Sequence, residues 1–240
     1  DALNYACYQD ARFMLVATPA GIALAPEGGA HQSVNTPLIG MSQDGLTAFE
    51  PAFADELAVV MAWGFEHMQR DDGGSVYLRL STRPLEQPRR AMTEDLRGDI
   101  VSGAYWLRPP SPDAELAVVY SGAVVPEVLE AHTQIQEDIP GAGLLAVTSA
   151  GRLHAGWVAA SKAGARDRHT APSHAESLLA VLAADATLVT VLDGHPAALD
   201  WLGSVGRHRV MPLGVDRFGQ SGDIPDLFHA YGIDAEAVLG

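Results

Sequence analysis

A glycine-rich polar segment near the start of the chain holds the residues best suited to chemistry. It reads Glu27-Gly28-Gly29-Ala30-His31-Gln32-Ser33. The unperturbed pKa of histidine is about 6.5, so the His31 ring can accept or release a proton near neutral pH, and a loop lets the ring reach a cleft. A nearby carboxylate such as Glu27 would fix the ring tautomer or raise its pKa. The segment is a candidate proton-transfer site, but the residues alone favour a solvated surface histidine.

The other candidate groups give weaker signals. His67 and His132 fall on expected helices with acidic neighbours, so we expect both to be exposed. The spacing of His169 and His174 resembles a metal pair, but no third ligand follows at helical spacing, so we expect no metal site. Cys7 is the only cysteine, which rules out a disulfide within the chain and favours a small half-buried side chain.

Composition limits the function classes. The 240 residues include 15 Lys and Arg against 30 Asp and Glu, a formal net charge of −15. Nucleic acids and anionic membranes bind clustered cations, so we expect neither as a partner. The longest apolar run, Leu57 to Phe65, is far shorter than the about 20 residues that a membrane span needs. The 48% share of hydrophobic residues predicts a sizeable core, and the single cysteine fits a reducing cytoplasm, where we expect the protein to work.

Short apolar runs alternate with helical patterns, which predicts an α/β fold of mostly parallel sheets covered by helices on both faces. Ser173 with Glu176 forms a capping-box pattern at the start of one helix. The expected strands are 13–17, 75–80, 116–120, 144–148, 188–192 and 209–213. The expected helices are 51–68, one from about 126, 173–183, 196–202 and two short ones within 224–240.

The segment from Pro84 to Gly98 breaks this alternation. It holds two prolines and several charged residues and lacks a sustained apolar period. We interpret it as a linker and place a domain boundary there, between residues 1–90 and 98–240.

Several segments together resemble one enzyme family. The histidine segment is similar to a loop of the pyrimidine-binding domain in transketolase-like, thiamine-diphosphate-dependent enzymes. The stretch Glu50 to Glu56 resembles the start of a helix in the single-chain bacterial pyruvate dehydrogenase component, and it favours that branch over true transketolases. Gly214 to Ser221 is near the family's Asp-x-Phe-Gly-x-Ser signature and is the most specific match. Looser matches are 147–149 and 169–172, and the matches run in order along nearly the whole chain.

The resemblance implies roles for the residues of the histidine segment. His31 matches a histidine implicated in proton transfer or substrate binding, and Glu27 matches an acidic position of the same loop, so both are candidate catalytic residues. Gln32 and Ser33 are expected to neighbour the substrate. The turn around Gly219 is expected to lock the C-terminal domain, with the glycine adopting an unusual backbone angle.

The resemblance also implies what this chain lacks. Family members hold thiamine diphosphate and Mg²⁺ through a Gly-Asp-Gly motif, and none occurs here. Residues 1–90 would be the second half of the pyrimidine-binding domain, and residues 98–240 a transketolase C-terminal-like domain. The whole enzyme would decarboxylate a 2-oxo acid, pyruvate first, and pass the acyl group to a lipoyl-bearing acyltransferase as a homodimer. We expect the chain alone to bind no cofactor and to be inactive.

Two alternatives remain open at this level. A transketolase-type enzyme would move two-carbon units between sugar phosphates and would need cations placed for a phosphate. Arg79, Arg83, Arg89 and Arg90 are available, but without the expected spacing. A module that only dimerises or binds partners would explain the missing cofactor motifs.

Overall fold

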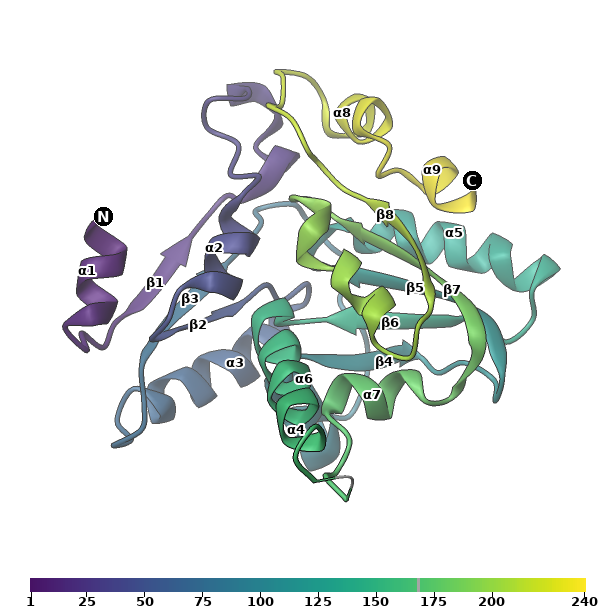
Figure 1. Cartoon of the computed structure of the whole chain (residues 1–240). Coiled ribbons are helices and arrows are strands. Elements are labelled where there is room, and N and C mark those ends of the chain that lie inside the picture. The colour runs from purple at the N-terminus through teal and green to yellow at the C-terminus, as the bar shows by residue number, and fades with distance from the viewer. Residues whose placement is uncertain (168) are drawn as a thin grey trace.

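The computed structural model describes residues 1–167 and 169–240. The first part of the chain forms a small sheet of three parallel strands (Figure 1). Its strands are β1 (Met14–Ala17), β2 (Leu46–Phe49) and β3 (Ser75–Arg79), in the order β1-β3-β2. All five residues of β3 are buried, although the alternation of Val76 and Leu78 with Tyr77 and Arg79 is typical of a strand with one exposed face. The central strand of a covered parallel sheet has no exposed face, which explains the difference.

The second part forms a sheet of five strands in the order β4-β6-β5-β7-β8. They are β4 (Ala104–Arg108), β5 (Ala114–Ser121), β6 (Gly143–Val147), β7 (Leu182–Leu192) and β8 (Arg209–Leu213). Only β4 is antiparallel to its neighbour, and the other pairs are parallel. The predicted α/β class with mostly parallel sheets is confirmed.

Helices cover both faces of the larger sheet, as the side chains of β5 show. Val118 and Tyr120 pack into one apolar cluster, together with residues of α5, α8 and α9. Val119 packs into a second cluster with residues of α6 and α7. The helices are α1 (Ala2–Tyr8), α2 (Thr36–Ser42), α3 (Ala54–His67), α4 (Glu94–Ser102), α5 (Val125–Asp138), α6 (Ala150–Gly164), α7 (His174–Leu179), α8 (Ile224–Tyr231) and α9 (Ala235–Leu239). Short 3-10 turns are η1 (Gly21–Ala23), η2 (Ala25–Glu27), η3 (Gly122–Val124), η4 (Pro196–Ala198) and η5 (Asp200–Ser204).

Several boundaries differ from the sequence prediction. The segment interpreted as a linker ends in α4, which Thr93 caps by accepting a hydrogen bond from the Leu96 N–H at 3.2 Å. Helix α3 starts at Ala54 rather than Pro51, because the Glu56 carboxylate accepts the backbone N–H groups just before it. The segment 196–202 forms 3-10 turns instead of one helix. The predicted capping box at the start of α7 is present.

The carboxyl ends of strands from both sheets meet in the middle of the molecule. Glu50 follows β2, Arg79 ends β3, Ser121 ends β5 and Asp193 follows β7. One apolar cluster contains Phe49 and Leu78 from the first sheet as well as residues of the second, so the core is continuous across them. This junction lies where open α/β sheets place their ligands, at the carboxyl ends of parallel strands. In the described part of the chain, no helix has the length and apolar character that crossing a membrane requires.

Candidate functional site

His31 lies on an exposed loop between η2 and α2. Gly28 opens the loop with a φ of 81°, a left-handed conformation that glycine adopts readily, and its carbonyl accepts the His31 N–H at 3.1 Å. The Glu27 side chain is also exposed. Within the described residues, no hydrogen bond or ion pair joins Glu27 to His31. The structure therefore leaves the His31 ring accessible on the molecular surface, with a carboxylate in the same loop but not in contact with it.

Gln32 joins the histidine loop to the turn that carries the most specific sequence match. Its side chain is buried, and its amide Nε2 donates to the Gln220 carbonyl at 3.0 Å. Gly29 packs so tightly on the Gly219 carbonyl that a Cβ would overlap that oxygen. The expectation of an unusual backbone angle at Gly219 is wrong, because its φ is not among the left-handed ones. A Cβ there would overlap the Gln32 amide oxygen, so a larger residue would displace the Gln32 side chain.

Ser33 holds the other side of the loop. Its hydroxyl accepts the Gly21 N–H at 3.2 Å, and its carbonyl accepts the Arg79 guanidinium at 2.9 Å. The Gln32 and Ser33 contacts of the described chain are thus made within the protein. Both residues fix the loop on which His31 is carried.

Arg79 is the centre of a buried polar network beneath this loop. It is 3% exposed, and its guanidinium pairs with the Glu50 carboxylate. Its Nε donates to the Thr36 hydroxyl at 2.9 Å, and one terminal nitrogen donates to the carbonyls of Ser33 and Asp193. Each nitrogen of the guanidinium has a partner, which is the arrangement in which a buried arginine is tolerated.

Asp193 extends the network to the segment that precedes the loop. Its carboxylate oxygens accept the Ile22 and Ala23 backbone N–H groups at 2.7 and 3.1 Å. Burial raises the pKa of Asp193 and of Glu50, while the Arg79 charge opposes both shifts. Two carboxyls and one guanidinium thus share a buried site that holds the loop's two flanks against the strand ends.

The sequence analysis missed this network. Arg79 ends a strand of the smaller sheet and Asp193 follows a strand of the larger one, and no local pattern connects them. One sequence feature could have indicated the network. Both charged residues come at the carboxyl end of a buried apolar strand, and such ends of parallel strands lie at the same edge of a sheet.

Three other histidines make hydrogen bonds within the protein, and two of them, His67 and His132, were expected to be exposed. His132 is buried, with its Nε2 at 2.9 Å from the Ala142 carbonyl, so the expectation that it is exposed is wrong. His67 is half-buried and accepts the Gly74 N–H. His174 Nε2 lies 2.7 Å from the Ala104 carbonyl.

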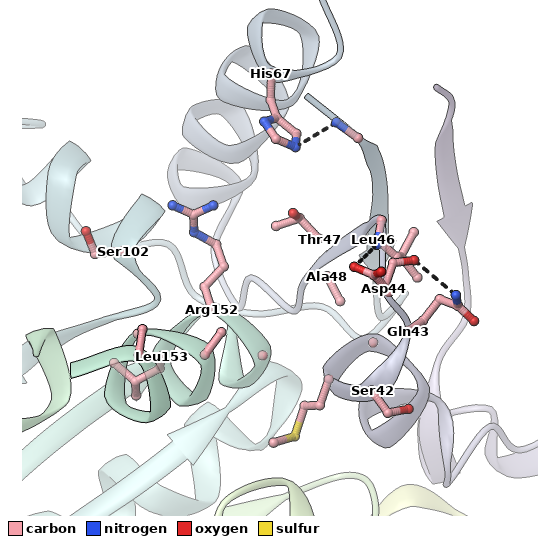
Figure 2. Close-up of a pocket in the computed structure, with 18 of the residues that line it drawn as sticks. Ser42, Gln43, Asp44, Leu46, Thr47, Ala48, His67, Ser102, Arg152 and Leu153 are labelled. Carbon is pink, nitrogen blue, oxygen red and sulfur yellow. Dashed lines mark hydrogen bonds between the residues drawn. The ribbon is translucent and has the colours of Figure 1, made fainter. Parts of the chain in front are cut away.

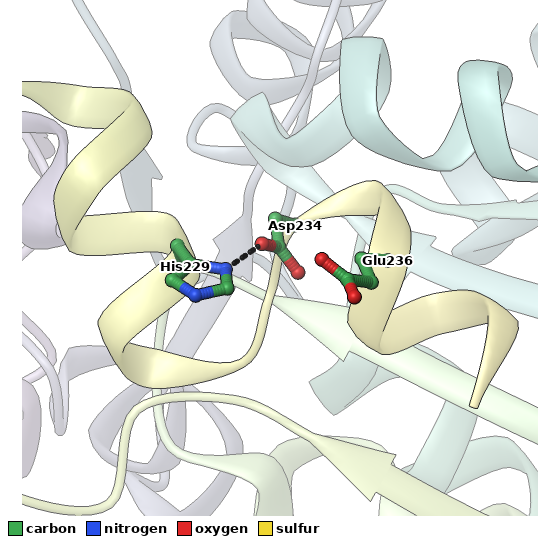
Figure 3. Close-up of side chains that lie close together, drawn as sticks. All are labelled: His229, Asp234 and Glu236. Carbon is green, nitrogen blue, oxygen red and sulfur yellow. Dashed lines mark hydrogen bonds and ion pairs between the residues drawn. The ribbon is translucent and has the colours of Figure 1, made fainter.

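One group of potential metal ligands occurs among the described residues, on α8 and at the start of α9 (Figure 3). His229 Nδ1 lies 2.7 Å from an Asp234 carboxylate oxygen, and the ligand atoms of His229, Asp234 and Glu236 all lie within 4.8 Å of one another. The hydrogen bond to Asp234 and the charge of that carboxylate raise the pKa of His229. The group lies on the surface. Among the described residues, no fourth potential ligand joins these three side chains.

A site for thiamine diphosphate requires oxygen ligands for a divalent cation beside the diphosphate. The carboxylates beneath the histidine loop are those of Glu50 and Asp193, and they are engaged by Arg79 and by backbone N–H groups. The described residues therefore do not fit the diphosphate and metal portion of such a site. Above this network, the side chains of Glu27 and His31 remain exposed on the loop.

The chain is similar to known proteins both in sequence and in fold. No family model matches. The chain is 30% identical over its whole length to the pyruvate dehydrogenase E1 component of Mycolicibacterium smegmatis and 25% identical, over 96% of its length, to that of Escherichia coli. It spans 26% of the length of each of these relatives.

Solved structures show the same fold. The transketolase of Leishmania mexicana matches 99% of the chain with a TM-score of 0.76 and 20% identity, and the chain covers 31% of it. A split-gene transketolase described as an inactive β4 tetramer matches 97% of the chain with a TM-score of 0.67 and 18% identity. In that case the chain covers 66% of the solved chain.

Proposed function

Because this chain is related to the C-terminal region of thiamine-diphosphate-dependent, transketolase-like enzymes, we propose that it is part of a pyruvate dehydrogenase E1-type component. The complete enzyme would decarboxylate a 2-oxo acid, with pyruvate as the first candidate, and transfer the acyl group to a lipoyl-bearing acyltransferase. The observation that carries the proposal is the direct packing of the two most family-like segments. The histidine loop and the 214–221 turn contact each other through Gly29, Gln32 and their partners, although they lie at opposite ends of the chain.

In this proposal His31 is the residue that gives or takes a proton at the rim of the pocket. Its exposure supports the assignment, because a substrate or a cofactor held by other protein can reach the ring. The negative charge of Glu27, in the same loop, would favour the protonated form of the His31 ring. Gln32 and Ser33 would lie next to the substrate and position His31 through their contacts with Gln220 and Gly21.

The remaining parts of the site would come from protein outside this chain. Residues 1–90 would be the second half of a pyrimidine-binding domain, and residues 98–240 a C-terminal domain that supports a homodimer. Protein beyond these residues would supply the diphosphate and Mg²⁺ ligands, and the assembled enzyme would work in the cytoplasm.

The test joins the chain to the part of a relative that lies outside the matched region. The chain is fused to the complementary part of the Mycolicibacterium smegmatis pyruvate dehydrogenase E1 component, and assembly of the fusion is checked by sedimentation. We expect release of carbon dioxide from pyruvate that depends on added thiamine diphosphate and Mg²⁺. His31→Ala should lower kcat by about 10²–10⁴-fold, the range typical of a general acid or base.

His169→Ala is the matched control, because this histidine is also exposed and on a loop. It should leave the rate unchanged. An assembled fusion that transfers two-carbon units between sugar phosphates but does not release carbon dioxide would assign the chain to the transketolase branch instead. Equal activity of His31→Ala and the unmodified fusion would remove His31 from the chemistry.

A non-catalytic module is the second candidate, motivated by the absence of the cofactor motif and by the split-gene structural neighbour that is titled as an inactive tetramer. Calorimetry of the chain with thiamine diphosphate and Mg²⁺, together with its sedimentation, separates the two. A stable oligomer whose fusion remains inactive would favour the module. Tight binding of the cofactor by the chain alone would mean that the division of the site between this chain and other protein is wrong.

A further inference from the structure

A cavity of about 860 Å³ lies between the two parts of the fold (Figure 2). Residues of α2, β2 and the end of α3 form one wall, and residues of α6 form the other. Several walls are bare backbone, because glycines line the cavity at the end of α2, after α3 and in α6. The volume is within the range of about 300–1,000 Å³ that pockets for small molecules occupy.

Arg152 extends from the first turn of α6 into this cavity, on the side of His67 (Figure 2). Its guanidinium carbon lies 4.6 Å from the centre of the Trp63 ring, a cation–π contact that holds the side chain in place. Its Nε is inaccessible to solvent and has no hydrogen-bond partner. Among the described residues, none forms a hydrogen bond or ion pair with the Arg152 side chain.

The carboxylates that line the cavity do not neutralise Arg152. Asp72 is engaged by Arg70, whose nitrogens donate to both of its oxygens at 2.9 Å. The Asp44 carboxylate accepts the Gly45 N–H at 3.0 Å. Burial, together with the neighbouring Arg70 charge, lowers the pKa of Arg152. A partly desolvated guanidinium without a counter-ion is costly, and a bound anion would remove that cost.

His67 adds a second polar group. Its ring stacks on Trp63, with 4.4 Å between the ring centres and 14° between the planes. Nε2 accepts the Gly74 N–H at 3.1 Å, so the neutral ring carries its proton on Nδ1. Burial and the charge of Arg152 lower the pKa of His67, which keeps the ring neutral beside the guanidinium.

We infer that this cavity binds a small organic anion, with its carboxylate or phosphate group on the Arg152 guanidinium and its remainder in the space between α2 and α6. A guanidinium fork matches the oxygens of either group, which is the shared chemistry of the two possible ligand types. The ligand would contact both parts of the fold at a place separate from the histidine loop. The inference is independent of the reaction proposed above.

The test uses the whole chain and two probes, inorganic phosphate and citrate, at constant ionic strength set with chloride. Binding is followed by calorimetry and by tryptophan fluorescence, since Trp63 contacts Arg152 directly. At least one probe should bind saturably and change the fluorescence. Arg152→Met keeps an apolar stem on Trp63 and should weaken binding about tenfold or more, while Arg209→Met, an exposed arginine on β8, should leave it unchanged.

Saturable binding of phosphate alone identifies a phosphorylated ligand, and binding of citrate alone a carboxylate ligand; both results support the inference. Circular dichroism of each variant establishes that it is folded. The inference is overturned if neither probe binds saturably, or if folded Arg152→Met binds as tightly as the unmodified chain.

Discussion

Two arginines of this molecule have opposite environments. Arg79 is almost fully buried, and each of its nitrogens donates to a protein acceptor. Arg152 is partly buried and, within the described residues, makes no polar contact with the protein. The first arrangement leaves no capacity for a ligand and is structural, whereas in the second no nitrogen of the guanidinium is engaged by a protein acceptor of the described chain. Burial of a charged residue therefore says little about its role until its partners are counted.

The largest expected effect is that of Arg79→Met. The substitution leaves the Glu50 carboxyl and the Asp193 carbonyl without their cationic partner in a buried site. Removing one member of a buried ion pair costs about 3–5 kcal/mol of unfolding free energy. Urea denaturation measures the loss. A loss of unfolding free energy below about 0.5 kcal/mol, the range of ordinary surface substitutions, would show that water replaces the guanidinium and that the network does not stabilise the fold.

A smaller loss of stability is expected from crowding the contact between the histidine loop and the 214–221 turn. Gly29→Ala would place a methyl group on the Gly219 carbonyl, and the overlap should cost about 1–3 kcal/mol. Gly98→Ala is the matched control, because no atom lies within 4 Å of the added methyl on α4, and it should stabilise by about 0.5–1 kcal/mol. Thermal denaturation compares them. Equal melting temperatures would mean that the two segments separate freely.

The buried carboxyls should also shape the pH dependence of stability. Burial raises the folded-state pKa of Glu50 above its ordinary value of 4.5, so its contribution to stability is full below that value and is lost as the pH rises through the raised pKa. The contribution changes by at most about 1.4 kcal/mol per pH unit. Glu50→Gln should flatten the decline above about pH 4.5, measured by urea denaturation at a series of pH values. A steeper decline in the variant would reverse the assigned sign.

The smallest effect on stability is expected from Arg152→Met. In the described structure this side chain has no polar partner to lose, and methionine keeps an apolar contact with Trp63. The unfolding free energy should fall by no more than about 0.5 kcal/mol, because removal of the unpaired guanidinium offsets the lost cation–π contact with Trp63. A loss comparable to that of Arg79→Met would show that Arg152 has a structural role and would remove the contrast between the two arginines.

The amino-acid sequence by itself determined the alternation of strands and helices. Periodic apolar residues identified α3, short apolar runs identified β1 and β5, and the Ser173 capping box marked the start of α7. These features depend on near neighbours along the chain, so local patterns are sufficient to predict them. The glycine-rich segment that bears His31 was recognised in the same way.

Tertiary structure decided what local patterns do not encode. Helix α6 is rich in glycine and alanine and has no strong apolar stripe, and it is held by its close approach to α2, where a Cβ at Gly151 would lie 3.1 Å from the Gly40 carbonyl. The partners of Arg79 and the absence of partners around Arg152 come from segments distant in sequence. Both environments exist only because the two sheets bring their strand ends and flanking helices together, and contacts of that kind depend on packing across the whole chain.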